Sequence, residues 1–158
     1  MTATSFLIRQ AEEKDTATIV DFNASMALET EDLSLDRNVL EKGVQSVFKN
    51  PEYGVYYVAE NEGKVVACLL ITLEWSDWRN GMLWWIQSVY VRPQFRRKGV
   101  FKALFQFVEN LVAEKKNVAG LRLYVEHENE TAQKTYEHLG MVKTGYRLYE
   151  KLSKNHGA

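Results

Sequence analysis

The sequence has one cysteine, almost no net charge and no long hydrophobic run, and each shortage excludes a class of protein. Because Cys68 is the only cysteine in 158 residues, no disulfide can form within the chain. The formal net charge is −1, so the chain has no overall field that attracts nucleic acid or an anionic membrane. No apolar segment approaches the ~18 residues that a membrane-spanning helix needs.

The amino-terminal residues and the composition indicate a cytoplasmic globular protein. The opening MTATSF lacks the basic and hydrophobic regions of a secretory signal. Cys68 lies in an apolar run, where a reduced, buried side chain is usual. The length suits one domain over residues 1–158, with one hydrophobic core.

The first third of the chain predicts a short strand and two helices. Apolar residues at 6–8 predict the strand. Asp15 can cap a helix, because its carboxylate can accept hydrogen bonds from N–H groups of the first turn. Residues 28–35 have the character of an acidic linker, and Asp36 can cap a second helix that ends near residues 50–51.

Three β-like runs follow. They cover residues 55–60, 65–75 and 82–91 and are separated by two short turns, which predicts an antiparallel meander. The third run is apolar on both faces, as expected of a strand near the middle of a covered sheet.

The rest of the chain alternates between helix and strand. An apolar stripe after Gly99 predicts an amphipathic helix. Residues 120–126 alternate as a strand, Asn129 can cap another helix, and Gly140 can end it in a left-handed conformation. Residues 141–152 predict a final strand. The resulting order, β-α-α-β-β-β-α-β-α-β, is an α+β layer sandwich with one central sheet.

Basic residues stand at the start of the predicted third helix, where Arg96, Arg97 and Lys98 precede Gly99. Helix N-termini attract anions, glycine allows close approach of a ligand, and arginine can bind phosphate with two nitrogens. Neither the Walker nor the dinucleotide glycine spacing is present. Charge runs also commonly face water, so the spacing alone leaves an anion site and a solvated helix start as alternatives.

Two longer motifs decide between these alternatives. Residues 89–104 follow V-x-P-x-x-[RQ]-x-x-G-x-[GA] at Val91, Pro93, Arg96 and Gly99. Residues 129–141 follow N-x-x-A-x-x-x-Y-x-x-x-G-[FM] at Asn129, Ala132, Tyr136, Gly140 and Met141. Together they resemble the GNAT superfamily of N-acetyltransferases, and the opening IRQAEEKDTATI resembles the first strand and helix of that family.

The resemblance implies a GNAT-like three-layer α/β/α sandwich with a mixed, mostly antiparallel sheet. It also implies a cleft between the fourth and fifth strands that binds acetyl-CoA, with the pyrophosphate on the amides of residues 97–101. The pantetheine arm would pair with Val89 and Val91. Cofactor contacts are therefore expected at Val89, Val91, Arg96, Arg97, Lys98, Gly99, Val100, Phe101, Asn129 and Tyr136.

Phe101 departs from the motif, which has Gly or Ala at this position. Its amide can still donate to a phosphate oxygen. We expect its side chain to turn into the apolar stripe beside Phe105.

The resemblance also assigns catalytic roles. The N–H of Val89 would polarise the acetyl oxygen, and Tyr136 would protonate the sulfur of CoA, although a half-buried helix aromatic is the alternative for Tyr136. Many relatives carry a glutamate on the fourth strand where this sequence has Gln87, and an amide cannot accept a proton. A base must then come from elsewhere.

Acidic and aromatic loop residues are the remaining candidates for the acceptor site. Glu29, Glu31 and Asp77 are the candidate general bases, and Glu29 is the first choice. The alternative is that all three are loop acids that only face solvent. Trp75 and Trp78 beside Asp77 can form a box for an ammonium group, or they can pack in a turn or a subunit interface. The predicted substrate residues are Glu29, Glu31, Trp75, Asp77 and Trp78.

The resemblance, together with the acidic and aromatic loop residues, predicts an acetyltransferase that moves an acetyl group from acetyl-CoA to a small-molecule primary amine by direct attack in a ternary complex. A non-catalytic acyl-CoA sensor and an enzyme acting on protein lysines or N-termini are the alternatives. No nucleic acid or membrane partner is expected, and family habit allows a homodimer. His127 and His138 lack partners at metal-ligand spacing, so no metal is predicted.

Overall fold

The computed structural model describes residues 4–156, which divide into two compact units. Unit 1 comprises the residues up to Leu123, and unit 2 begins at Tyr124. The strands of unit 1 are β1 (Leu7–Gln10), β2 (Val55–Asn61), β3 (Lys64–Ser76), β4 (Gly81–Val91) and β5 (Val118–Arg122). Its helices are α1 (Thr16–Glu31), α2 (Arg37–Lys49) and α3 (Val100–Glu114), and unit 2 contains α4 (Glu130–His138).

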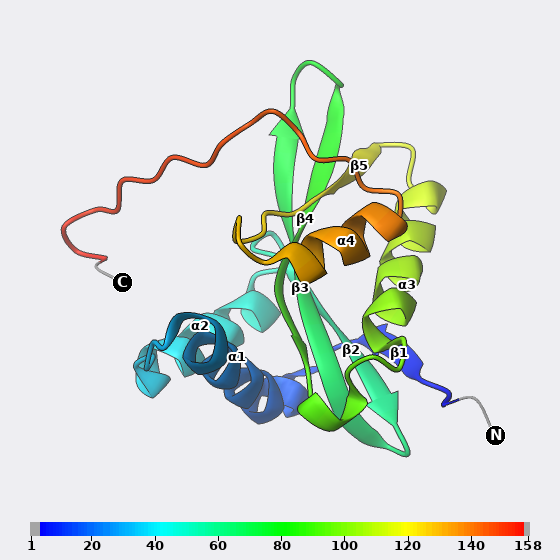
Figure 1. Cartoon of the computed structure of the whole chain (residues 1–158). Coiled ribbons are helices and arrows are strands. Elements are labelled where there is room, and N and C mark those ends of the chain that lie inside the picture. Colours follow the sequence, from blue (N-terminus) through cyan, green and yellow to red (C-terminus); the bar gives the residue numbers. More distant parts are fainter. Residues whose placement is uncertain (1–3, 157–158) are drawn as a thin grey trace. The chain divides into compact units, whose positions relative to one another are not determined.

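The five strands form one sheet in the order β1-β2-β3-β4-β5 (Figure 1). The first four are antiparallel to their neighbours, and β5 runs parallel to β4. This confirms the predicted meander and the mixed, mostly antiparallel sheet.

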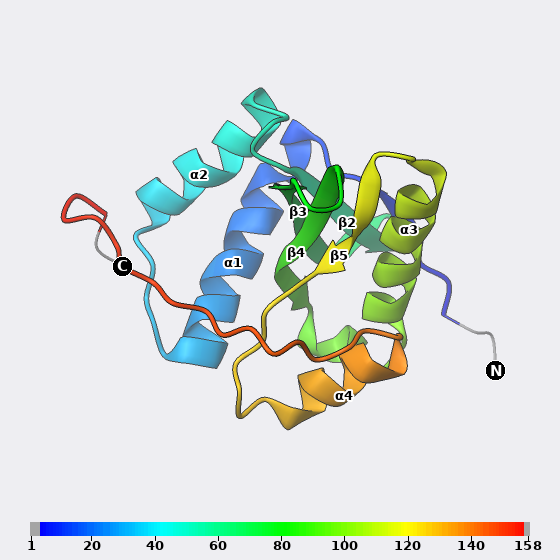
Figure 2. The same ribbon diagram turned by 90° about the horizontal axis from the view of Figure 1, so that it is seen from above.

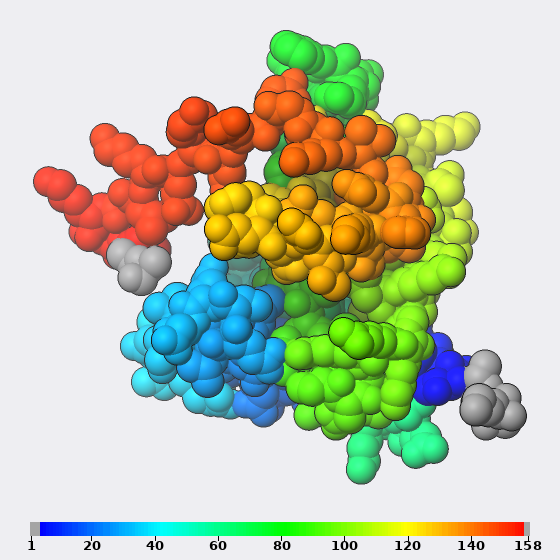
Figure 3. Space-filling model, viewed as in Figure 1, coloured from blue at the N-terminus to red at the C-terminus, as the bar shows by residue number. Residues whose placement is uncertain are grey.

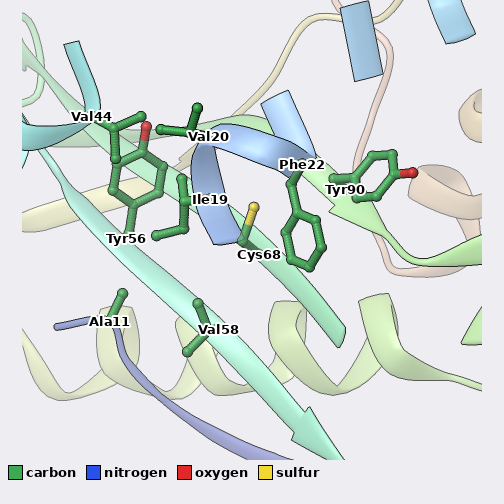
Figure 4. Packing of buried hydrophobic residues seen from close by; sticks show 9 residues of the cluster. All are labelled: Ala11, Ile19, Val20, Phe22, Val44, Tyr56, Val58, Cys68 and Tyr90. Atoms are coloured by element: carbon green, nitrogen blue, oxygen red, sulfur yellow. The ribbon is translucent and has the colours of Figure 1, made fainter. Parts of the chain in front are cut away.

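Helices cover both faces of this sheet in unit 1 (Figure 2). The core between the sheet and α1 and α2 contains Ile19, Val44, Tyr56 and Cys68, all buried (Figure 4). On the other face α3 packs on the sheet, where the ring centroid of Phe107 lies 5.7 Å from that of Tyr57. The three-layer α/β/α arrangement is therefore confirmed.

Several predicted helix ends are confirmed by their hydrogen bonds. The Asp36 carboxylate accepts from the N–H groups of Asn38 and Val39 at the start of α2. In unit 2 the Asn129 side chain accepts from Ala132 N at 3.1 Å. Gly140 has a φ of +89°, the left-handed conformation that ends a helix after its last turn.

The role predicted for Asp15 is wrong. The helix begins next to it, but its carboxylate caps no first-turn N–H group of α1. The carboxylate accepts hydrogen bonds from two nitrogens of Arg9, Nη1 at 2.8 Å and Nη2 at 3.0 Å, and from the N–H of Glu12. A nearly buried carboxylate gains more from a guanidinium than from neutral amides, because charged hydrogen bonds are the stronger ones.

The linker predicted at residues 28–35 is also wrong in its first half. Helix α1 continues to Glu31 and ends where Asp32 adopts a φ of +50°. Residues 28–31 contain neither glycine nor proline, so nothing in them interrupts the helix.

Of the last two predicted strands, one lies at a different position in the structure and the other is absent from the described residues. Strand β5 occupies 118–122 rather than 120–126, because its register is set by pairing with β4 from Met82 to Trp85. Residues 141–152 form no strand in the described structure. Alternation alone does not make a strand, because a strand also needs a partner for its backbone hydrogen bonds.

Candidate functional site

Strand β4 has a β5 partner along only part of its length. The parallel pairing runs from Met82 to Trp85 and ends where Trp85 faces Arg122. Beyond Trp85, no described residue of β5 pairs with β4 as far as Val91. The second half of this edge therefore presents main-chain groups that an extended ligand can pair with.

A bulge interrupts β4 within this unpaired half. Cys68 pairs with Tyr90 and Leu70 with Gln87, so two residues of β4, Ser88 and Val89, stand opposite a single residue of β3. Ser88 has a φ of +51°, and the Cys68 thiol donates to the Ser88 carbonyl at 3.6 Å. Bulges re-aim main-chain groups and recur next to active sites. The predicted oxyanion donor, Val89, lies at this irregularity.

The turn that enters α3 contains two left-handed residues and has no side-chain cap. Gly99 is the N-cap, has a φ of +81°, and brings no side-chain cap, so the first-turn N–H groups meet no capping side chain. Arg97, two residues before it, is also left-handed, with a φ of +62°. A Cβ built on Gly99 would meet nothing within 4 Å. Glycine is needed here for its backbone conformation, and open space adjoins the turn.

Phe101 has the predicted orientation. Its ring centroid lies 6.1 Å from that of Phe105 on the next turn of α3. The side chain therefore belongs to the apolar stripe of the helix, and the departure from the motif changes packing within α3.

Arg96 connects this turn to the end of α1. Its Nη2 donates to Glu29 Oε2 at 2.8 Å, its Nε donates to Val91 O at 2.9 Å, and its guanidinium lies 5.4 Å from the centre of the Tyr90 ring. The Tyr90 hydroxyl donates to Glu29 Oε1 at 2.9 Å. Hydrogen bonds from Arg96 and Tyr90 lower the pKa of the Glu29 carboxyl.

This network changes the interpretation of Glu29. A carboxylate with a lowered pKa and two donors is a weak proton acceptor. The structure therefore disfavours the base role predicted for Glu29 and indicates that it positions Arg96 and Tyr90. Glu31, two residues later at the end of α1, is exposed.

The predicted aromatic box lies at the other end of β4. Trp75 pairs with Met82, seven residues before Val89, which is about 23 Å along a strand. Asp77 and Trp78 are in the turn beyond it, where Trp78 is 87% exposed (green tip in Figure 3). This separation argues against contact between the three residues and a small acceptor at the bulge.

A polar row that the sequence analysis missed crosses the sheet near the bulge. Gln87 Nε2 donates to Thr72 Oγ1 at 2.6 Å, and Arg122 Nη1 donates to both oxygens of Glu74 at 3.0 and 3.1 Å. Thr72, Trp85 and Arg122 are aligned by the strand register. The signal available in the sequence was the pair Thr72 and Glu74, two polar residues on the same face of the otherwise apolar run 65–75.

The remaining two predicted residues belong to unit 2. Asn129 is the N-cap of α4, and Tyr136 lies half-buried on the same helix. Burial raises the pKa of Tyr136, so its hydroxyl stays protonated at neutral pH and can act as a proton donor.

Within residues 4–156, no three His, Cys, Asp or Glu side chains are grouped so as to hold a metal ion. No helix of this part of the chain has the length and apolar character to cross a membrane.

Comparisons with known proteins agree with this geometry. The model of the acetyltransferase (GNAT) family matches residues 18–141, which span both units. The crystal structure of a possible acetyltransferase from Clostridium difficile 630 is 46% identical, with a TM-score of 0.88, covering 94% of this chain and 97% of that one. No curated protein matches the chain.

A more distant structure shares the fold. It is a predicted acetyltransferase with acetyl-CoA from Clostridium acetobutylicum, 19% identical, with a TM-score of 0.74 and coverage of 93% of this chain and 96% of that one.

Proposed function

Because the chain belongs to the acetyltransferase (GNAT) family, we propose that it transfers an acetyl group from acetyl-CoA to the primary amine of a small molecule. The observation that carries the proposal is the unpaired, bulged edge of β4 beside the uncapped N-terminus of α3. An extended pantetheine arm and a pyrophosphate need these two features side by side.

The residues of the turn suit a diphosphate. The amides of residues 97–101 would donate to its oxygens, and Arg97 and Lys98 would add positive charge. Val89 and Val91 would pair with the pantetheine arm along the β4 edge. Asn129 would contact the same arm. Acetyl-CoA supplies an activated carbonyl and a thiolate leaving group, and the chain supplies placement and charge stabilisation.

The chemistry needs a polarised carbonyl, a neutral amine and a proton for the leaving sulfur. The Val89 N–H would stabilise the negative charge on the acetyl oxygen, and the Tyr136 hydroxyl would protonate the sulfur. Gln87 already donates to Thr72 and accepts no proton. We therefore propose that water carries the proton of the amine to solvent.

The environment of Cys68 supports our proposal of direct attack in a ternary complex. Its side chain is fully buried, and burial raises the pKa of the thiol to about 12. A thiol that stays protonated at neutral pH is a poor nucleophile, so a covalent acetyl-cysteine is disfavoured.

The polar row supports a small, polar acceptor. Glu74 and Arg122 are about two-thirds buried and form an ion pair beside Trp85. In such a pair, the Glu74 carboxylate can accept a hydrogen bond from an ammonium group and the Arg122 guanidinium can donate two hydrogen bonds. Both groups lie within reach of the bulge. Trp85 precedes Gln87 by two residues on β4, which is about 7 Å along the strand, so the ion pair lies close to Gln87.

The test is release of CoA thiol from acetyl-CoA with a panel of amines, amino acids, polyamines and peptides. We expect turnover with small amines and a kcat lowered about 10²-fold or more in Tyr136→Phe, with little change in KM for acetyl-CoA. Turnover with peptides alone would refute the small-molecule acceptor. Binding of acetyl-CoA by calorimetry without turnover on any acceptor would favour a sensor.

A further inference from the structure

A row of side chains on one face of the sheet leads away from the bulge in β4. Gln87 and Trp85 are two residues apart on β4, so they lie on the same face of the strand. Trp85 pairs with Arg122 of the neighbouring strand β5 (Figure 1). Glu74 of β3 pairs with Leu83, the next residue of β4 on this face. The row therefore runs from Gln87 beside the bulge, past Trp85, to an ion pair at its far end.

Arg122 uses only one of its three guanidinium nitrogens in that ion pair. Nη1 donates to both oxygens of Glu74, at 3.0 and 3.1 Å. Within the described residues of unit 1, Nε and Nη2 of Arg122 donate to no other group. The N–H groups of Nε and Nη2 point the same way in the plane of the guanidinium and match the two oxygens of a carboxylate. Arg122 therefore keeps a binding edge of two nitrogens, and Glu74 holds that edge in place.

This edge favours a carboxylate over a second ammonium group. A carboxylate bound to Nε and Nη2 has the positive guanidinium between itself and Glu74, so the attraction outweighs the repulsion between the two carboxylates. An ammonium group would bind at Glu74, whose oxygens already accept from Nη1, and it would lie beside the guanidinium charge. Both side chains of the pair are about two-thirds buried, which strengthens these charge effects relative to open water.

Gln87 supplies the opposite end of the row. Its Nε2 donates to Thr72 Oγ1 at 2.6 Å, which leaves the side-chain carbonyl oxygen to accept an N–H from an amine. Because Gln87 and Trp85 are two residues apart, an amine at Gln87 and a carboxylate at Arg122 are separated by about 7 Å or slightly more. The half-buried Trp85 lies between them in the row, and an indole ring gives methylene groups an apolar surface.

We propose that the acceptor is an amino acid whose reacting amine is separated from its carboxylate by a straight chain of several methylene groups. The amine binds at Gln87, the chain lies over Trp85, and the carboxylate binds Nε and Nη2 of Arg122. An amine and a carboxylate on the same carbon are too close together to reach both ends of the row. The inference rests on the proposed function for the reaction, whereas the carboxylate site depends only on contacts within unit 1.

The first experiment compares 6-aminohexanoate, hexylamine and 1,5-diaminopentane as acceptors. They share an amine and five methylene groups and end in a carboxylate, a methyl and an ammonium group. We expect kcat/KM for 6-aminohexanoate to exceed that for each of the others, and that for glycine, by about 10-fold or more. In Arg122→Gln the preference over hexylamine should fall to about one. The control Lys116→Gln removes an exposed positive charge from the loop before β5 and should keep the preference.

The second experiment measures binding without turnover. Hexanoate has no amine, so it reports the carboxylate site alone, and hexan-1-ol is its uncharged match. By NMR titration we expect the Kd of the wild type for hexanoate to be about 10-fold lower than for hexan-1-ol, and the two values to become equal in Arg122→Gln.

The outcomes separate this inference from the proposed reaction. Tighter binding of hexanoate through Arg122 without turnover of any amine would refute the reaction and support the carboxylate site. Equal kcat/KM for 6-aminohexanoate and hexylamine, or a higher value for 1,5-diaminopentane or glycine, would overturn the inference while the reaction stands. Both comparisons use the wild type, so they decide even if Arg122→Gln does not fold. A preference for the carboxylate that persists in a folded Arg122→Gln would overturn it as well.

Discussion

Arg96 and Glu29 form an ion pair of 2.8 Å that connects the loop before α3 to the last turn of α1. Arg96 belongs to the V-x-P-x-x-[RQ]-x-x-G motif, and Glu29 lies 67 residues earlier in the chain. The pair therefore joins the turn that we propose binds the diphosphate to the end of α1. We propose that Glu29 is a positioning residue that acts on the reaction through its hydrogen bonds with Arg96 and Tyr90.

Glu29→Gln should weaken acetyl-CoA binding rather than the chemical step. We expect KM for acetyl-CoA to rise about 3- to 10-fold with kcat almost unchanged, because Arg96 loses its anchor and the reacting groups keep theirs. Both partners are about 40% exposed, so stability should fall by less than about 1 kcal/mol. Steady-state kinetics and thermal unfolding check this, and a large fall in kcat alone would restore Glu29 as a base.

The pH dependence should lack an enzyme base. With Gln87 unable to accept a proton, kcat/KM should rise about tenfold per pH unit until the pKa of the acceptor amine is reached. Gln87→Glu places a carboxylate at that position and should flatten the acid limb of the profile. An acid limb in the wild type that levels off well below the amine pKa would instead reveal a base among other residues.

Cys68→Ala should leave turnover intact. The thiol is buried and protonated, so we expect kcat within about twofold of the wild type and a loss of about 1–2 kcal/mol in unfolding free energy from the cavity and the lost contacts. Mass spectrometry after exposure to acetyl-CoA should show no acetylated Cys68. Loss of turnover in a variant that remains folded would contradict direct attack.

Asp15→Asn should destabilise the fold, because it leaves Arg9 without its main partner. Asp15 is 5% exposed, and removing one member of a buried pair costs about 3 kcal/mol, reduced here because Glu60 also contacts Arg9. Urea unfolding measures the loss. The control Asp21→Asn removes the exposed pair with Arg37 and should cost less than about 1 kcal/mol.

The same pair predicts the acid limit of stability. Burial acts to raise the pKa of Asp15, but the hydrogen bonds from Arg9 and from the Glu12 N–H outweigh it, and the pKa is lowered from its ordinary 3.8. A carboxyl with a lowered folded pKa contributes its stability above its ordinary pKa and loses it as the pH falls through the folded one. The wild type should therefore lose its advantage over Asp15→Asn only below about pH 4.

Local patterns predicted most of the elements, because their signals lie within a few neighbouring residues. Asp36 and Asn129 cap helices at the expected positions, and the turns at 61–64 and 76–81 join the expected strands. Asp15 was misread because its partner, Arg9, lies outside the helix that it precedes.

The sequence by itself determined the family, the order of the elements through α4, and the turn at Gly99, since each is written in adjacent residues. Only the tertiary structure decided where the pairing between β4 and β5 ends. Because it ends at Trp85, the bulge at Ser88 lies in the part of β4 that β5 does not pair with. The tertiary structure also brought Glu29 to Arg96 and Glu74 to Arg122, pairs far apart in the chain. Strand pairing and helix packing set these distances, and no local pattern contains them.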